Sequence, residues 1–322
     1  MLYPLKFNSI LKEKIWGGNK LYFKTEEKIH DKKIGESWEI SGIKNEVSVI
    51  KNGSLRGKSL QDILEEFEDK LVGKSVFERF NYEFPVLIKL IEAKENLSVQ
   101  LHPDDRLAKK RHNSFGKTEM WYILEAEEDS RLIIDFNESI TVERYQELLK
   151  KGDLEAALNT VKVKEGDAFF IKPGLVHAIG AGITLAEIQQ TSDITYRLFD
   201  WNRTDKEGNP RQLHTDLALD AINFDSHNDY KIQYHPKLNS KVSLASTPYF
   251  ITNYLKVKGG LDLNYSNLDS FTILMNVGHE DAFIVHEKLN YTISSKETLL
   301  IPACLDFIRL ESKGTKLLEI SI

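Results

Sequence analysis

The sequence predicts an all-β protein with helical insertions, and three observations support this class. Short apolar runs dominate the chain, and several have apolar residues at alternate positions, which is the period of a strand. Gly, Asn, Asp and Ser separate many of these runs, as turn residues do between strands. Helix-like patterns occur only as isolated insertions. Many short strands with turns between them are typical of a β-sandwich or a β-barrel.

In the N-terminal part of the chain, strand patterns surround four helix-like insertions. A Ser-x-x-Asp start at Ser59 and Asp62, followed by apolar residues at helical spacing, predicts a capped amphipathic helix. Gly152 separates two further helix-like runs. The expected helices are 59–67, 141–149, 153–158 and 215–222, and the expected strands are 85–91, 97–101, 120–126, 131–136, 167–171 and 184–189.

From about residue 240 the pattern changes to strands alone. The expected strands there are 241–246, 251–257, 271–276, 282–285, 291–293, 299–301, 306–310 and 316–320. The polar segment 225–239 is expected to be a linker. We therefore expect two domains, a larger one at 1–239 that carries the helical insertions and the linker, and a smaller β domain at 240–322.

Composition excludes several classes of protein. The chain of 322 residues has a formal net charge of −6, which gives no support to nucleic-acid binding. No apolar run approaches the roughly 20 residues that span a bilayer, and a single cysteine excludes an internal disulfide framework. We expect a cytoplasmic protein without a membrane partner. Its oligomeric state stays open.

Three short segments suggest a metal site. Gln100 and His102 lie two residues apart in an expected strand, so both side chains leave the same face. Glu119 lies in a second such segment, and His177 follows a Pro-Gly turn after a third strand. Either histidine alone is more often a packing residue than a ligand. Together, two imidazoles, a carboxylate and an amide oxygen make a plausible shell for a borderline divalent metal. A closed structural zinc site would draw on cysteines, and the chain has only Cys304.

These segments resemble a known family. The motifs LSVQLHPD (97–104), GKTEMWY (116–122), PGLVHA (173–178) and EIQQTSDITYRLFDWNR (187–203) closely resemble type I mannose-6-phosphate isomerases, as do IWGG (15–18) and GESWE (35–39). The resemblance implies two jelly-roll (cupin) β-barrels. It also implies a metal-dependent enzyme that interconverts mannose-6-phosphate and fructose-6-phosphate through a cis-enediol. Zinc, one ion per chain, is the implied cofactor, although spacing alone does not exclude iron, manganese or cobalt.

Carried over motif by motif, the resemblance implies a role for each site residue. The implied metal ligands are Gln100, His102, Glu119 and His177. The implied catalytic residues are Arg197, Lys117, Glu187 and Asp193. The acid/base stays open among Lys117, Glu187, Asp193, Arg203 and a metal-bound water, with orientation of Lys117, Arg197 or Arg203 as the other role of Glu187 and Asp193. The implied phosphate-binding residues are Lys89, Ser98, Arg197 and Arg203.

Lys89 also attracts attention without the resemblance. It is a charged residue in an otherwise apolar expected strand. Burying an ammonium group without a partner costs free energy, so a lysine at this position suggests an anion nearby. A lysine whose ammonium extends to solvent is the plainer alternative.

A comparison of the two expected domains predicts that the second binds no metal. Aligning the turn at 172–177 with the segment 302–307 places Cys304 opposite Gly174 and Phe307 opposite His177. The second site therefore lacks its imidazole. We expect Cys304 to be a small core residue and Phe307 to be a buried aromatic side chain.

Two other functions remain to be weighed against the isomerase. One is a cupin Fe(II) oxygenase, whose sites favour two histidines and one carboxylate. The cations Lys89, Lys117 and Arg197 argue against it, because an oxygenase needs no phosphate-binding group. The other is a non-catalytic sugar-binding cupin that has kept the pocket and lost the chemistry.

Overall fold

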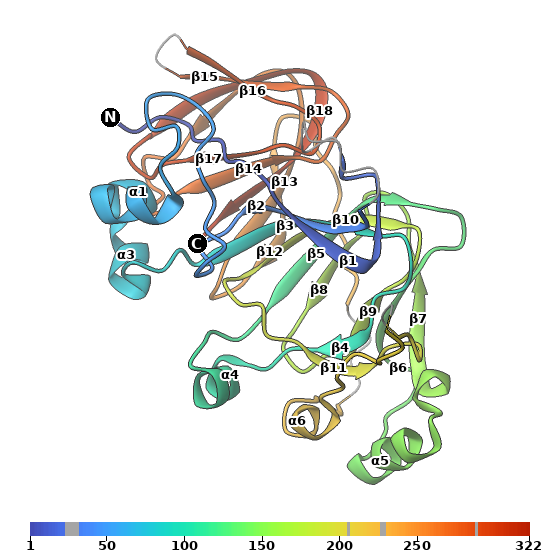
Figure 1. Cartoon of the computed structure of the whole chain (residues 1–322). Coiled ribbons are helices and arrows are strands. Elements are labelled where there is room, and N and C mark those ends of the chain that lie inside the picture. Colours follow the sequence, from blue (N-terminus) through green and yellow to red (C-terminus); the bar gives the residue numbers. More distant parts are fainter. Residues whose placement is uncertain (23–31, 205–206, 226–229, 287–288) are drawn as a thin grey trace. The chain divides into compact units, whose positions relative to one another are not determined.

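The chain forms two compact units, each made of segments that are distant in sequence. The computed structural model describes all residues except 23–31, 205–206, 226–229 and 287–288 (Figure 1). The C-terminal unit consists of Met1–Ile10, Trp38–Lys89 and Gln233–Ile322, and the central unit consists of Leu11–Ser37 and Leu90–Ile232. The expected domains at 1–239 and 240–322 are consecutive segments, whereas these units are not. That division stays a prediction.

The central unit is built on two β-sheets. In the first, the strand order is β1 (Ile10–Gly18), β2 (Ile34–Ile40), β3 (Val86–Ala93), β10 (Ile183–Gln190), β5 (Glu119–Ala126) and β8 (Ala168–Ile171). In the second, it is β11 (Tyr196–Phe199), β4 (Val99–Leu101), β9 (His177–Ile179), β6 (Arg131–Phe136) and β7 (Leu158–Lys162). β2 and β3 continue along the chain into the C-terminal unit. The prediction of a mostly β fold is confirmed.

One hydrophobic core cluster contains buried residues of both sheets. Trp121 and Phe169 contribute to it from the first sheet, and Leu132 and Ile134 contribute from the second. β10 is buried at every position, although four of its eight residues are polar, namely Thr184, Glu187, Gln189 and Gln190. Polar side chains buried in such a strand require partners.

Helices cover the other face of the second sheet. They are α4 (Asp105–His112), α5 (Val142–Lys151), a 3₁₀ turn (Leu154–Ala157) and α6 (Thr215–Leu219). Tyr145 and Leu148 of α5 pack in a second apolar cluster with Val99 and Ala178 of the sheet. α6 lies beside β11 (Figure 1). The helices predicted at 141–149, 153–158 and 215–222 are confirmed. The one predicted at 153–158 is a 3₁₀ turn.

The C-terminal unit contains a seven-stranded sheet. Its main order is β12 (Lys241–Ser246), β13 (Ile251–Asn264), β18 (Phe307–Ser321), β14 (Thr272–Asn276) and β17 (Thr298–Ile301), with β15 (Ala282–His286) and β16 (Leu289–Ile293) paired beside β18. The separate strands predicted at 306–310 and 316–320 are wrong, because both belong to β18. β13 likewise runs past the predicted end at 257. A register shift between Val257 and Gly259 bends the paired strands without ending them.

The first helical insertion belongs to this C-terminal unit. Helix α1 (Leu60–Phe67) starts at Ser59 with the predicted capping box, in which Ser59 and Asp62 bond each other's backbone N–H groups. Two short helices follow, α2 (Asp69–Val72) and α3 (Lys74–Phe80). The first two backbone N–H groups of α3 donate to the Asp269 carboxylate at 2.6 and 2.8 Å. The insertion is thus tied to residues almost two hundred positions further along the chain.

Two predicted core residues are on the surface. Phe307 is 53% exposed, and Cys304 is exposed as well. The prediction that both are buried is wrong. Side chains alternate along β18, so Ile308 and Leu310 point inward while Phe307 points outward. Cys304 lies in the turn that precedes this strand.

The segment predicted as a linker is only partly one. Tyr230 is buried in the core of the central unit, and its carbonyl accepts a hydrogen bond from the Phe170 N–H. The Ile232 N–H donates to Ala168 of β8. Residues 230–232 therefore extend the first sheet, and 226–229 lie outside the described residues. In the described part of the chain, no helix is long and apolar enough to cross a membrane.

Candidate active site and metal centre

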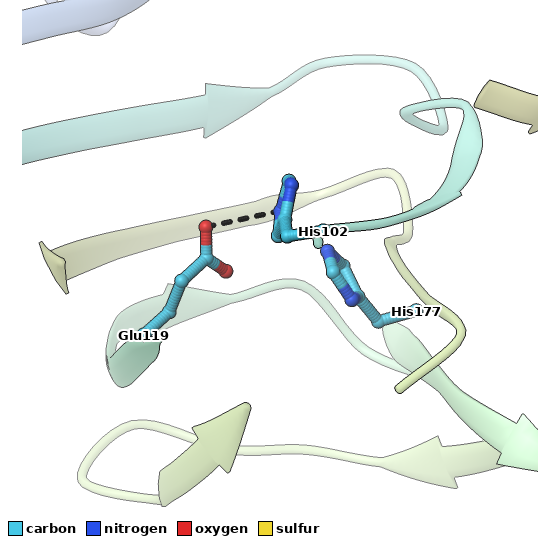
Figure 2. Close-up of side chains that lie close together, drawn as sticks. All are labelled: His102, Glu119 and His177. Atoms are coloured by element: carbon cyan, nitrogen blue, oxygen red, sulfur yellow. Dashed lines mark ion pairs between the residues drawn. The ribbon is translucent and has the colours of Figure 1, made fainter. Parts of the chain in front are cut away.

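Three of the predicted ligands come together inside the central unit. His102 directly follows β4, Glu119 begins β5 and His177 begins β9. The three side chains are almost completely buried, with 1%, 0% and 1% exposure. One ligand atom from each lies within 4.8 Å of the other two (Figure 2). Both sheets therefore contribute to one compact group of two imidazoles and a carboxylate.

Backbone carbonyls orient both imidazoles. The Nδ1 atom of His102 lies 2.8 Å from the Ile194 carbonyl oxygen, and Nδ1 of His177 lies 2.9 Å from the Leu175 carbonyl oxygen. Each Nδ1 can satisfy its carbonyl only as an N–H donor, which assigns the lone pair to Nε2. Within the described residues, the buried Nε2 atom of His177 has no hydrogen-bond partner. Such an arrangement presents nitrogen lone pairs to a metal ion.

Glu119 is held in its charged form by a cation. Its Oε1 atom lies 2.5 Å from the ammonium nitrogen of Lys117. The same oxygen lies 3.2 Å from Nε2 of His102 (Figure 2). Burial alone would raise the pKa of Glu119. The lowering by Lys117, and then by His102, is larger than this effect, so the pKa of Glu119 is well below its usual range. Oε2 has no hydrogen-bond partner among the described residues.

The two histidines are neutral because burial lowers the pKa of each imidazole. Burial, reinforced by the charge of Lys117, lowers the pKa of His102 to about 4. Burial also lowers the pKa of His177. Neutral imidazoles and an ionised carboxylate are the protonation states that a divalent ion requires of its ligands. These residues therefore fit a metal ion, with Nε2 of His177 and Oε2 of Glu119 as donors that nothing else in the described chain uses.

The turn before His177 is fastened to the strand that carries His102. Gly174 adopts a left-handed conformation with φ of +81°, and its N–H donates to the His102 carbonyl at 2.8 Å. A Cβ atom at this position would lie 2.5 Å from the Ala221 carbonyl oxygen, so only glycine fits. Gly174 satisfies two requirements at once, and the turn keeps the two imidazole-bearing segments together.

Gln100, the fourth predicted ligand, lies between Arg197 of β11 and His177 of β9 in the strand register. Its side-chain oxygen accepts a hydrogen bond from the Ser98 hydroxyl at 3.2 Å. Gln100 is thus next to the histidine in the sheet. Its place in the ligand set stays a prediction.

The predicted catalytic residues separate into two groups. Lys117 lies 4.0 Å from Glu187, whose other carboxylate oxygen accepts a hydrogen bond from the Trp121 indole at 2.9 Å. Both are buried beside the triad. Asp193, by contrast, is exposed in the loop between β10 and β11.

The predicted phosphate-binding residues also differ in their surroundings. Arg197 donates from Nε to the Ser98 hydroxyl at 3.3 Å. Arg203 pairs with the Asp200 carboxylate and donates to the Asn96 carbonyl at 2.6 Å. Lys89 is buried in β3, and its ammonium lies 5.3 Å from the centre of the Trp38 ring.

Sequence reasoning missed three residues around Arg197. Asp200 is buried and accepts hydrogen bonds from Arg211 as well as from Arg203. His214 bonds the backbone of Arg197. Asp200 lies within the motif at 187–203 and could have been noticed there. Arg211 and His214 follow the last recognisable motif, and only the folded chain brings them to β11.

Comparisons with known proteins show the family of this chain. Residues 4–145 match the family model described as phosphomannose isomerase type I, catalytic domain. The chain is 33% identical to the mannose-6-phosphate isomerase ManA of Bacillus subtilis over 96% of both chains, and 38% identical to a mannose-6-phosphate isomerase of Streptococcus mutans over 69% of this chain and 68% of that one. The crystal structure of the mannose 6-phosphate isomerase from Bacillus subtilis superposes with a TM-score of 0.87 at 28% identity and covers 100% of both chains. The chain therefore belongs to the type I mannose-6-phosphate isomerase family.

Proposed function

We propose that this protein is a metal-dependent aldose–ketose isomerase that interconverts mannose-6-phosphate and fructose-6-phosphate through a cis-enediol. The observation that carries the proposal is the buried group of His102, Glu119 and His177 in a member of this family. The oxygenase and the non-catalytic alternative find no support among the relatives, which are mannose-6-phosphate isomerases by name.

The proposed cofactor is one zinc ion per chain. His102, Glu119 and His177 would hold it, together with Gln100. Nitrogen and oxygen donors of this kind suit zinc, and a set without cysteine is typical of sites that leave a position for substrate. When bound, the ion supplies Lewis-acid polarisation of the sugar oxygens O1 and O2.

The residues of the site must move two protons. Isomerisation of the aldose through an enediol transfers the proton on C2 to C1 and the hydroxyl proton on O2 to O1. Lys117 and Glu187 are the proposed acid/base residues, and their burial 4.0 Å apart beside the triad supports them. A buried acid/base group can transfer a proton to or from a bound sugar without competition from water. Asp193 is exposed, so only its place in the family motif supports a catalytic role for it.

Arg197, Ser98, Arg203 and Lys89 are the proposed phosphate-binding residues. The hydrogen bond between Arg197 and Ser98 supports treating these two as one anion-binding element. Lys89 has the Trp38 ring as a cation–π partner, so its burial by itself no longer requires an anion. For Arg197 we propose a second role, the stabilisation of negative charge on the enediolate.

The substrate bears on location. A phosphosugar carries about two negative charges at neutral pH and does not cross a membrane unaided. This chemistry and the lone Cys304 support a cytoplasmic location, which we propose.

The test is an assay of fructose-6-phosphate formation from mannose-6-phosphate. We expect turnover in the isolated protein, its loss after exhaustive chelation and its return on addition of Zn²⁺. A separate measurement of metal content should give about one ion per chain, as for other sites with a single catalytic ion. Unchanged turnover in protein shown to be metal-free would contradict the metal-dependent mechanism.

A further inference from the structure

A short segment after β11 runs alongside this strand at Arg197. The backbone N–H of His214 donates to the Arg197 carbonyl at 2.7 Å. In return, the Arg197 N–H donates to Nδ1 of the His214 imidazole at 3.1 Å. The two bonds together resemble a rung of an antiparallel ladder in which a side chain has replaced one carbonyl. Both backbone polar groups of Arg197 are therefore bonded to the same residue.

The same segment also holds the guanidinium of Arg197. Nη1 donates to the Gln212 carbonyl at 2.8 Å, and Nε donates to the Ser98 hydroxyl on the neighbouring strand at 3.3 Å. Because Arg197 is paired with Gln100 in the strand register, the guanidinium is fixed between β4 and the segment 211–214. Two of its five N–H donors are used in this way, which leaves a planar group with a set direction for an anion.

Arg211 anchors the start of the segment. Its Nε and Nη2 atoms bond the two oxygens of the buried Asp200 carboxylate, with 2.7 Å for the first contact. A bidentate contact of this type fixes orientation as well as distance. The segment is thus attached at one end through Arg211 and at the other through His214.

We propose that His214 is a positioning residue for the isomerase reaction, whose imidazole acts as a hydrogen-bond acceptor that fixes the backbone of β11 at Arg197 and so aims the guanidinium. The proposal rests on the role of Arg197 in the proposed function. Burial, and then the charge of Arg197, lowers the pKa of His214, which keeps the ring neutral and able to accept.

A purely structural role as a helix cap is the alternative. His214 is the N-cap residue of α6, but its side chain makes no capping hydrogen bond. The imidazole is bonded to Arg197 and not to the helix. Loss of the ring should therefore disturb β11 before it disturbs α6.

Three substitutions at this position separate the two roles. His214→Asn keeps an acceptor, because the amide oxygen stands the same number of bonds from Cβ as Nδ1. His214→Ser introduces a residue that favours the N-cap position, but its hydroxyl oxygen stands one bond closer to Cβ than Nδ1 does. We expect kcat/KM for mannose-6-phosphate to fall up to about 100-fold in His214→Ala, as for a misplacement of about 1 Å. His214→Asn should recover most of this loss and His214→Ser little of it, at wild-type metal content.

A double-mutant cycle with Arg197→Ala gives the sharper result. If His214 acts through Arg197, then adding His214→Ala to Arg197→Ala should lower kcat/KM by less than about twofold, because the two losses are not independent. Tyr196→Phe is the matched control. It removes the hydroxyl that bonds Nε2 of His112 at 2.8 Å, and its effect should be the same with and without Arg197.

Independent multiplication of the His214 and Arg197 effects would overturn the proposal, as would an unchanged kcat/KM in His214→Ala. Should His214→Ala not fold, the comparison of Asn with Ser decides, and equal activity of these two variants would overturn it. A wild-type protein without isomerase activity would instead defeat the proposed function.

Discussion

Two turns of this protein look alike in sequence and differ in what they present. The turn at 172–177 leads into β9, whose first residue is His177, and the turn at 302–307 leads into β18, whose first residue is Phe307. His177 is 1% exposed and Phe307 is 53% exposed. The first residue of one strand thus faces the core, and the first residue of the other faces solvent.

The difference teaches that a matching turn does not fix the face of the strand that follows. Side chains alternate along a strand, so a shift of one residue exchanges the buried face for the exposed one. In β18 the inward residue is Ile308. The turns differ in backbone as well, since Gly174 needs a positive φ and Cys304 does not. The C-terminal turn therefore lacks both an imidazole and the geometry to present one.

The largest expected effect is on metal binding, when the first residue of β9 or of β18 is replaced. His177→Ala should reduce metal affinity by at least about 100-fold, because loss of a group that merely supports a ligand already costs 10–100-fold. Phe307→His should leave the metal content unchanged, since the new imidazole would point to solvent. Metal analysis after gel filtration measures both. A second ion in Phe307→His would refute this account of the C-terminal turn.

Stability should follow the same alternation along β18. Ile308 is fully buried, so Ile308→Ala should lower the free energy of unfolding by about 2–5 kcal/mol. Phe307→Ala, a larger truncation, should change it by less than about 0.5 kcal/mol because the ring is largely exposed. Urea unfolding of the two variants gives the comparison. Equal losses would mean that Phe307 packs in solution.

The glycine requirement distinguishes the two turns at their centres. In Gly174→Ala, the positive φ and the contact with the Ala221 carbonyl should together destabilise the protein by about 1–3 kcal/mol. Metal affinity should also fall, because this turn is bonded to His102. Cys304→Ala is the control and should be nearly neutral. Thermal unfolding and metal titration measure both effects, and a stable Gly174→Ala with normal metal affinity would contradict the argument.

The smallest expected effect concerns a carboxylate in the C-terminal unit. Glu297 pairs with Lys6 at 2.8 Å and Lys51 at 3.0 Å. Burial opposes its ionisation, but the hydrogen bonds from Lys6 and the Ser294 N–H lower the pKa of Glu297 from 4.5 to about 2. A depressed pKa stabilises the folded state at pH values above 4.5, and that contribution is lost as the pH falls toward 2.

In Glu297→Gln this acid-dependent part of the free energy of unfolding should disappear. The effect should be smaller than that of Gly174→Ala, because the ion pairs are partly exposed to solvent. Unfolding curves recorded from about pH 5, just above the ordinary pKa of a glutamate, down to the lowered pKa of about 2 give the measurement. Glu66, paired on the exposed surface with Lys58, offers a control substitution. Parallel pH profiles of wild type and Glu297→Gln would count against the assignment.

The sequence predicted those parts of the fold that depend on neighbouring residues. β6 and β12 have the predicted bounds because their apolar patterns are local, and α1 starts at Ser59 because a capping box needs only four residues. The pairing of α3 with Asp269 depends on the folded chain, so no local pattern could reveal it.

The candidate site divides in the same way. His102, Glu119 and His177 were identified through motifs that carry their own spacing, and the structure brings them together. His214 has no such motif. Its partner is a backbone N–H group, which every residue but proline possesses, and the sequence therefore gives no sign of the bond.

The ion pair between Lys117 and Glu119 bears on whether the protein folds before it binds metal. A buried carboxylate without a counter-charge would oppose folding, but Glu119 obtains its cation from the chain itself. We therefore expect the chain to fold without metal. Newly made protein should therefore accumulate as a folded apoprotein and take up its ion afterwards, unlike small zinc domains that stay unfolded until they are loaded. Metal supply would then set how much of the enzyme is active, and not how much of it survives.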